Sequence, residues 1–161
     1  MERTEFAIAG YALRRGSAVD RALLLKFLTK TYQETAGTEN FQHLAETVSR
    51  HFSPQTPVWW VETTTKPPQP VGCLWLGNAI DQQQGDRHSY VLALYVAPEH
   101  RRRGIATALL QRAQGWATAR GDRQIGLQVF AANPGAIALY RKLGYQTHSL
   151  WLTKALPESD R

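Results

Sequence analysis

The segment from Tyr95 to Leu110 constrains the fold of this chain more than any other part of the sequence. Residues 90–96 are apolar and rich in β-branched and aromatic side chains, which predicts a buried strand. Pro98 ends that strand, because proline cannot donate a hydrogen bond to a neighbouring strand. Apolar residues then recur at helical spacing, and Gly121 follows as a C-cap glycine. The sequence therefore predicts a strand, a short turn and a helix that begins near residues 102–104.

The start of this predicted helix combines positive charge with an accessible backbone. The first turn of a helix leaves backbone N–H groups unpaired, and the aligned peptide dipoles add partial positive charge there. Gly104 has no Cβ, so an anion can approach the backbone closely. Arg101, Arg102 and Arg103 lie where cations oppose the dipole, and a bound polyanion would explain their presence. A solvated basic turn and a nucleic-acid contact are the alternative interpretations of the arginine run taken alone.

The spacing of these residues resembles a known cofactor motif. Val96, Pro98 and the run Arg101-Arg-Arg-Gly104-Ile-Ala106 resemble the acyl-CoA pyrophosphate motif of the GNAT superfamily of N-acetyltransferases, (Q/R)-x-x-G-x-(G/A) after a strand ending in Val-x-Pro. Residues 129–145 resemble the second cofactor motif of the family, N-x-x-A-x-x-x-Y-x-x-x-G-(F/Y). The residues that match it are Asn133, Ala136, Tyr140, Gly144 and Tyr145. Two motifs in the family's order indicate a GNAT protein.

The resemblance implies an α/β (α+β) architecture, the GNAT fold, with a mixed central sheet of about six or seven strands flanked by about four helices. We expect a single GNAT domain over residues 1–161, with 155–161 as a flexible tail. The strands predicted from the sequence pattern are 6–13, 58–63, 71–76, 90–96, 125–130 and 149–154. The predicted helices cover about 17–35, 41–52, 102–121 and 133–144, and 81–89 is expected to be a polar loop.

The resemblance also implies that acetyl-CoA is the co-substrate and that it binds along the predicted strand and turn. In the family, two strands splay apart beside the cofactor strand, aided by a bulge, and the pantetheine enters the gap. Backbone groups near Leu94 and Val96 would pair with the thioester and pantetheine, and backbone amides from Arg101 to Ala106, with the Thr107 hydroxyl, would hold the pyrophosphate. The cofactor-binding residues that follow are Leu94, Tyr95, Val96, Arg101, Arg102, Arg103, Gly104, Ile105, Ala106, Thr107, Asn133 and Tyr140.

Tyr140 corresponds to the tyrosine general acid of the family, which protonates the departing thiolate. A phenol is protonated at neutral pH and suits this role, although a tyrosine on a helix face is also typical of core packing. Asn133 has a second interpretation as a helix N-cap. Many family members carry a glutamate base early in the cofactor strand, but no carboxylate occurs between Ser89 and Val96. The remaining candidates for the base are Glu62 on a neighbouring strand, His88 and a chain of waters.

The acceptor is expected to be an amine, of either a small molecule or a protein. The family binds its acceptor with the loop between the first two helices, here about residues 35–40, and with the C-terminal strands. The short stretch after Gly144 favours a small-molecule amine or an exposed lysine over a protein N-terminus. Trp59, Trp60 and Trp75 are candidates for an acceptor pocket, with packing in the core as the alternative.

Charge and composition limit the classes of function that remain open. A formal net charge of +6 suits a cofactor with several phosphates, and a nucleic-acid binder is the more distant interpretation. An acyl-CoA-binding module with little turnover is the nearer alternative. Cys73 is the single cysteine and lies in an apolar strand pattern, which favours the core and a reducing cytoplasm. No metal-ligand spacing and no membrane-spanning run occur, and the open sheet edges of the fold leave room for a homodimer.

Overall fold

The computed structural model describes residues 3–35 and 40–159. The chain divides into two compact units, Met1–Phe130 and Ala131–Arg161, and a single domain over the whole chain stays a prediction. The elements of the first unit are β1 (Arg3–Glu5), β2 (Tyr11–Arg15), α1 (Arg21–Thr35), α2 (Gln42–His51), β3 (Val58–Thr63), β4 (Pro70–Ile80), β5 (Arg87–Val96), α3 (Ile105–Arg120) and β6 (Ile125–Gly126). Short 3-10 turns cover Ala18–Asp20 and Pro98–His100, and the second unit contains α4 (Pro134–Lys142).

One mixed sheet forms the centre of the first unit. Its six strands lie in the order β1-β2-β3-β4-β5-β6. Neighbours from β1 to β5 pair antiparallel, whereas β5 and β6 pair parallel through Ser89↔Ile125 and Tyr90↔Gly126. A parallel pair needs a crossover connection, and α3 supplies it. The observed architecture confirms the mixed α/β fold expected from the sequence.

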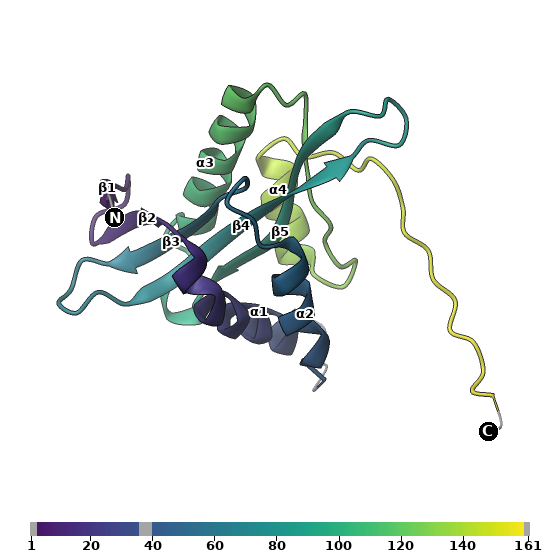
Figure 1. The fold of residues 1–161 in the computed structure, drawn as a ribbon, viewed down its shortest axis with the longest axis horizontal. Helices are drawn as coiled ribbons and strands as arrows, with labels where there is room; N and C mark the ends of the chain where they lie inside the picture. Colours follow the sequence, from purple (N-terminus) through teal and green to yellow (C-terminus); the bar gives the residue numbers. More distant parts are fainter. Residues whose placement is uncertain (1–2, 36–39, 160–161) are drawn as a thin grey trace. The chain divides into compact units, whose positions relative to one another are not determined.

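Helices cover both faces of this sheet. Trp59 and Trp60 are adjacent on β3, so their side chains point to opposite faces. Trp60 packs edge to face against Phe27 of α1, with ring centroids 5.2 Å apart, and Trp59 packs against Trp116 of α3 at 6.5 Å. The helices α1 and α3 therefore lie on opposite sides of the sheet (Figure 1).

The tryptophans and the cysteine singled out in the sequence lie in the core. Trp59, Trp60 and Trp75 are at most 2% exposed, so they pack against neighbouring elements rather than facing an acceptor. Cys73 is fully buried, and burial raises the pKa of its thiol to about 12. The thiol therefore stays protonated at neutral pH and is not a nucleophile.

The N-terminal strand prediction is wrong in its bounds. Instead of one strand over residues 6–13, β1 and β2 form a hairpin whose turn contains Gly10. Gly10 has a φ of +87°, and the Tyr11 N–H donates to the Ile8 carbonyl at 3.3 Å. The apolar pattern runs through this turn, so the pattern alone extended β2 backward over the turn and missed β1.

The two C-terminal strand predictions also fail in whole or in part. Of the strand predicted over residues 125–130, Ile125 and Gly126 pair with β5. The segment 149–154 forms no strand, and its apolar side chains, from Leu150 to Leu152, are exposed. A strand needs a neighbour to pair its backbone groups, and the second unit offers none among its described residues.

The loop predicted over residues 81–89 is shorter than expected. The strand β4 continues to Ile80 and β5 already begins at Arg87, where the two residues pair. The turn between them is closed by a hydrogen bond from the Asp81 N–H to the Asp86 carbonyl at 2.8 Å. Cross-strand pairing overrides the polar composition of this segment.

A buried ion pair between Arg120 and Asp122 stabilises the start of the β5–β6 pairing, at Ser89. Asp122 accepts hydrogen bonds from the backbone N–H and the hydroxyl of Ser89, at 2.8 and 2.5 Å, and from two guanidinium nitrogens of Arg120, at 2.9 and 2.7 Å. Arg120 also donates to Asn78 on β4 at 2.7 Å. Burial by itself would raise the pKa of Asp122, but the bonds from Arg120 and Ser89 outweigh it and hold the pKa below its usual 3.8.

We expect Asp122→Asn to lower the free energy of unfolding by about 1–3 kcal/mol at neutral pH, because Arg120 loses its charge partner. The folded pKa of Asp122 is lowered, so its contribution is complete above 3.8 and is lost as the pH falls through the folded value. Melting curves across pH measure this difference. Asp86→Asn, at an exposed pair with Arg123, is the matched control and should change stability by less than about 1 kcal/mol. A loss for Asp122→Asn that is equally large in acid would contradict the role of its charge.

Candidate active site

The connection from β5 to α3 is short and contains two residues in the left-handed region. Gly104 has a φ of +84° and Arg102 a φ of +63°. Turns of this kind direct successive backbone N–H groups toward one side and form anion-binding concavities. A left-handed arginine is strained by about 1–3 kcal/mol, and such strain gathers at binding sites. The buried Ile105 anchors the helix start, with its side chain packed over Gly72 of β4.

The first turn of α3 presents free backbone donors. Its first helical hydrogen bond runs from the Ala108 N–H to the Gly104 carbonyl at 3.0 Å. The N–H groups of Ile105, Ala106 and Thr107 precede it and have no backbone partner within the described part of the chain. Together with the helix dipole, these three donors form a site suited to phosphate oxygens.

The three arginines of the connection have different partners. Arg101 donates from Nε to the Val96 carbonyl at 2.8 Å and from Nη2 to Glu34 at 2.5 Å. Arg103 donates to the hydroxyl of Tyr11 at 2.6 Å. Arg102 is exposed, and among the described residues its side chain has no hydrogen bond or ion pair. Among the described residues, a carboxylate therefore balances the charge of Arg101, whereas Arg102 and Arg103 keep positive charge available for an anion.

The sheet opens beside β5 in the way the cofactor motif implied. The parallel pairing of β5 with β6 stops at Tyr90, and residues 127–130 do not continue it. A register shift in the β4–β5 pair places Trp75 opposite Ala93 and Leu76 opposite Val91, so Leu92 bulges out of the ladder. Beyond the bulge, the outer edge of β5 has no strand beside it within the described residues.

Comparison with known proteins agrees with this geometry. The profile of the acetyltransferase (GNAT) family matches residues 22–145. The chain belongs to the GNAT family. An uncharacterized N-acetyltransferase of Bacillus subtilis, YycN, is 31% identical over 144 residues, which cover 82% of this chain and 90% of that protein. An uncharacterized N-acetyltransferase of Methanocaldococcus jannaschii, MJ1207, is 36% identical over 83 residues, 48% of this chain.

The match covers unequal shares of these relatives. The chain spans 35% of the Methanocaldococcus jannaschii protein and 13% of the rice acetyl transferase GW6a, which is 41% identical over 56 residues. Among solved structures, a predicted acetyltransferase from Clostridium acetobutylicum with acetyl-CoA has a TM-score of 0.73 at 20% identity, covering 90% of this chain and 96% of its own. This likeness shows that the GNAT fold is shared.

The GNAT bulge depends on a glycine in the neighbouring strand. A Cβ at Gly77 of β4 would lie 2.6 Å from Cδ1 and 3.0 Å from Cγ of the bulged Leu92. The side chain of Leu92 therefore occupies the space that a larger residue would need. The strand pattern gave no sign of this requirement, because it depends on a residue of the next strand.

We expect Gly77→Ala to lower the free energy of unfolding by about 1–3 kcal/mol, because Leu92 must leave its position. Denaturant titration measures the change. Gly115→Ala, in α3 where a Cβ meets nothing within 4 Å, is the matched control and should leave stability equal or higher. Equal stability of Gly77→Ala and the wild type would show that Leu92 moves aside freely.

The predicted pantetheine-binding residues of this GNAT site lie at the open end of β5. Leu94, Tyr95 and Val96 pair with β4 on one side, and their other side faces the opened part of the sheet. The Val96 carbonyl accepts from Arg101, as described above, and the Tyr95 hydroxyl donates to Glu34 at 3.1 Å. The structure thus brings these three residues together with the start of α3.

Glu62, the first candidate base, is buried and already ion-paired. It is 6% exposed and accepts a hydrogen bond from Nε of Arg14. Arg14 also donates to both carboxylate oxygens of Asp20, at 3.0 and 3.1 Å. Glu62 lies opposite Pro70 of β4, so about two strand spacings, roughly 10 Å, separate it from the end of β5. Its carboxylate is directed into the protein's own network.

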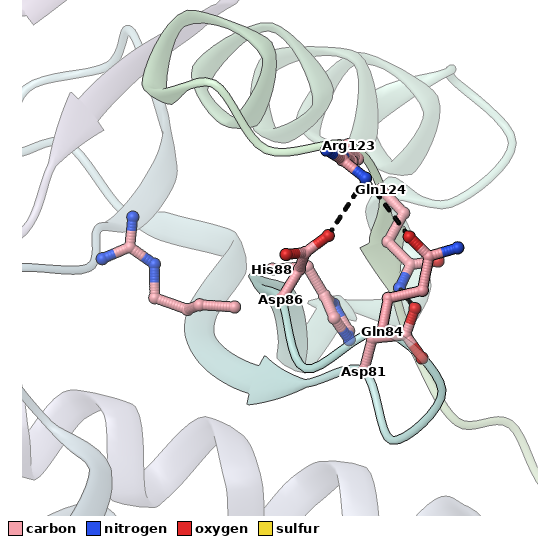
Figure 2. A pocket seen from close by; sticks show the side chains of 7 residues that line it. Asp81, Gln84, Asp86, His88, Arg123 and Gln124 are labelled. Carbon is pink, nitrogen blue, oxygen red and sulfur yellow. Dashed lines mark hydrogen bonds and ion pairs between the residues drawn. The ribbon is translucent and has the colours of Figure 1, made fainter.

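His88, the second candidate base, lies far from the turn between β5 and α3. At about 3.3 Å per residue, it is about 25 Å from Val96 along β5. It lines a polar hollow of about 220 Å³ at the β4–β5 turn, formed by Asp81, Gln84, Asp86, Arg87, His88, Arg123 and Gln124. Figure 2 shows Arg123 between Gln84 and Asp86, which it reaches at 3.2 and 3.3 Å. The His88 Nδ1 lies 2.9 Å from the Ser89 carbonyl oxygen.

Asn133 and Tyr140 belong to the second unit, so their roles in the site stay predictions. Asn133 caps α4, because its side chain accepts a hydrogen bond from the Ala136 N–H at 3.2 Å. Tyr140 packs edge to face with Tyr145 at 5.8 Å. Burial raises the pKa of Tyr140, and the neighbouring Tyr145 raises it further. The phenol is therefore protonated at neutral pH, as a general acid requires.

Sequence reasoning missed the residues that hold the turn between β5 and α3 in place. Glu34 lies 67 positions from Arg101, and Tyr11 lies 92 positions from Arg103. The Tyr11 hydroxyl also lies 2.7 Å from Nδ1 of His100. No local signal marks such long-range partners. The acceptor loop expected at residues 35–40 falls mostly outside the described residues.

Across residues 3–35 and 40–159, no group of three or more His, Cys, Asp or Glu side chains is arranged to hold a metal ion. No described helix has the length and apolar character needed to cross a membrane.

Proposed function

We propose that the protein transfers an acetyl group from acetyl-CoA to an amine. The observation that carries the proposal is the entry to α3. There, three N–H groups that have no backbone partner in the described part of the chain follow two left-handed residues at the open end of β5. Donors in this arrangement fit a pyrophosphate, and the free guanidinium of Arg102 adds positive charge. Membership of the GNAT family supports the same assignment.

The residues of the first unit would bind and orient the co-substrate. Acetyl-CoA, when bound, supplies the thioester carbonyl that the amine attacks. The amides of Ile105, Ala106 and Thr107 would hold phosphate oxygens, and the edge of β5 near Leu94 and Val96 would pair with amide groups of the pantetheine arm. Holding both reactants in place can contribute a large share of the rate enhancement in a reaction of this kind.

Tyr140 would supply the proton that the leaving sulfur takes up. The raised pKa keeps the phenol in the required protonated form. A protonated acceptor amine would lose one proton before it attacks, and neither Glu62 nor His88 lies at the open end of β5 to take it. The second proton, lost from nitrogen as the amide forms, would restore the Tyr140 phenol. We propose that a water chain carries the first proton to solvent, or that the acceptor amine is weakly basic.

The proposed acceptor is a small-molecule amine or an exposed lysine. One solved structure with the GNAT fold is an aminoglycoside acetyltransferase, HMB0005, with 25% identity and a TM-score of 0.64 over 91% of this chain and 99% of its own. Aminoglycosides therefore belong in the first panel of acceptors, beside polyamines, lysine peptides and peptides with free N-termini.

The test is a turnover assay that detects the free thiol of CoA for each acceptor in the panel. We expect thiol release that depends on one acceptor class, and a product whose mass has grown by one acetyl group. Release at the same rate without any acceptor would show hydrolysis instead and contradict amine transfer.

A second candidate function is an acyl-CoA-binding module with little turnover. The specific observation in its favour is that β5, from Arg87 to Val96, carries no carboxylate side chain, and Glu62 on β3 is paired with Arg14. Tight acetyl-CoA binding without thiol release for any amine would favour this module. Nucleic-acid binding is less favoured, because Arg101 and Arg103 contact the protein's own Glu34 and Tyr11.

A further inference from the structure

The Glu34 carboxylate links the C-terminal end of α1 to the turn between β5 and α3, residues 97–104, where phosphate is proposed to bind. This turn is called the phosphate-binding turn below. Glu34 accepts a hydrogen bond from the Tyr95 hydroxyl at Oε1, at 3.1 Å, and from Nη2 of Arg101 at Oε2, at 2.5 Å. Each carboxylate oxygen thus contacts a different residue, one on β5 and one in the turn. The three side chains, Glu34, Tyr95 and Arg101, form a cluster named the Glu34 latch below.

The Arg101 guanidinium in this latch spans the turn. Its Nε donates to the Val96 carbonyl at 2.8 Å, and its carbon lies 5.6 Å from the centre of the Tyr95 ring. The backbone N–H of Arg101 donates to the Pro98 carbonyl at 3.3 Å. The last residue of β5 and the first residue of the phosphate motif are therefore joined directly, three positions before Gly104.

Tyr95 is the member of the latch that the hydrophobic core holds in place. Its ring is 6% exposed and packs edge to face against Phe27 of α1 at 5.4 Å. Burial and the bond to Glu34 raise its pKa to about 12, so the hydroxyl stays a donor at every physiological pH. Because Tyr95 is held by the core, Glu34 is held too, and Glu34 in turn fixes the direction of Arg101.

We propose that Glu34 is a positioning residue for acetyl-CoA binding. Arg101, held by Glu34, acts as a strut, meaning that it keeps the turn in its conformation and does not itself bind phosphate. This inference rests on the proposed function. In this arrangement the charge of Arg101 is balanced by Glu34. The positive groups left for phosphate are Arg102, Arg103, whose printed contact is to the neutral Tyr11 hydroxyl, and the first amides of α3. The latch acts by keeping those amides in place.

The first test is Glu34→Gln, with acetyl-CoA affinity measured by calorimetry. The latch pair is partly exposed, 43% for Arg101 and 36% for Glu34, so a moderate effect is expected. Glu34→Gln should raise the Kd for acetyl-CoA about three- to tenfold. KM for acetyl-CoA should rise likewise while kcat stays within about twofold, because the chemistry is untouched. Tyr95→Phe, which removes one latch hydroxyl, should act in the same direction.

The matched control is Glu46→Gln. Glu46 also pairs with an arginine, Arg50 of α2, at 3.3 Å, and both side chains are exposed. It lies outside the latch, so its loss should leave the Kd for acetyl-CoA unchanged. An equal weakening in both variants would show a general effect of charge and overturn the proposal.

The opposite hypothesis predicts a change of opposite sign. If Arg101 leaves Glu34 to bind a phosphate, Glu34→Gln frees the guanidinium, and acetyl-CoA binds more tightly or equally well. For a strut, Arg101→Gln and Glu34→Gln weaken binding by similar factors, and the double variant is no weaker than the stronger single one. Tighter or unchanged binding by Glu34→Gln overturns the proposal, whereas a folded wild type that does not bind acetyl-CoA overturns the proposed function itself.

Discussion

Gly104→Glu is expected to weaken acetyl-CoA binding by at least about 100-fold while the protein stays folded. The new carboxylate would lie beside the three free N–H groups of α3, compete for them and repel the phosphates. A Cβ at Gly104 meets only Ile8 Cδ1, at 3.9 Å, so no steric clash opposes folding. The φ of +84° adds about 1–2 kcal/mol of strain for any L side chain. Calorimetric titration with acetyl-CoA measures the loss.

Two variants separate the causes of this loss. Gly104→Ala carries the backbone strain without the charge, and it should weaken binding by about tenfold or less. Gly85→Glu adds the same charge at another glycine of positive φ, +74°, where a Cβ also meets nothing within 4 Å. Gly85 lies in the turn at the opposite end of β5, so Gly85→Glu should bind acetyl-CoA with wild-type affinity. Wild-type affinity in Gly104→Glu would place the phosphates elsewhere.

Tyr140→Phe is expected to lower kcat by about 100- to 1000-fold, with the Kd for acetyl-CoA changed by less than about threefold. The variant keeps the ring and removes only the proton that the leaving sulfur needs. In the wild type the pKa of Tyr140 lies above its usual 10.0, so the rate should not fall through Tyr140 ionisation below that pH. Single-turnover rates across pH measure both effects.

The control for Tyr140→Phe is Tyr145→Phe, which removes a hydroxyl from the neighbouring ring at 5.8 Å. Its kcat should stay close to that of the wild type. Equal losses of kcat in both variants, together with lower melting temperatures, would mean that the tyrosine pair has a packing role and that another group donates the proton.

Local signals in the sequence predicted the parts of the site that depend on local geometry. Gly121 adopts left-handed backbone at the end of α3, as expected of a C-cap glycine. Asn133 caps α4 through its side chain, and Pro134 begins the helix. Each of these features involves residues within four positions of each other, so the sequence carries the information directly.

Other features depend on residues that are distant in the chain. The sequence assigned all three arginines to phosphate, whereas the structure pairs Arg101 with Glu34 and Arg103 with Tyr11. Which of several like charges meets a partner is decided by the packing of α1 and β2 against the turn. The left-handed conformation of Arg102 also has no signature in residue type, because arginine rarely adopts it.

Strand predictions failed for a related reason. The apolar segment 149–154 has the composition of a strand, but β-structure forms only where a neighbour pairs with the backbone. Conversely, the polar residues near His88 and Asn78 are strand because β4 and β5 pair across them. Whether a segment forms a strand therefore depends on the strands available beside it as well as on its own residues.

The most direct test of acetyl-CoA binding at the start of α3 is a two-dimensional amide NMR titration. With acetyl-CoA added, the largest shifts should occur at the backbone N–H groups of Gly104, Ile105, Ala106 and Thr107, which have no backbone partner among residues 3–35 and 40–159. The amide signals of the β4–β5 turn near Gly85 should not shift. Unchanged signals at residues 104–107, with the protein folded and acetyl-CoA in excess, would contradict the assignment of this turn as the cofactor site.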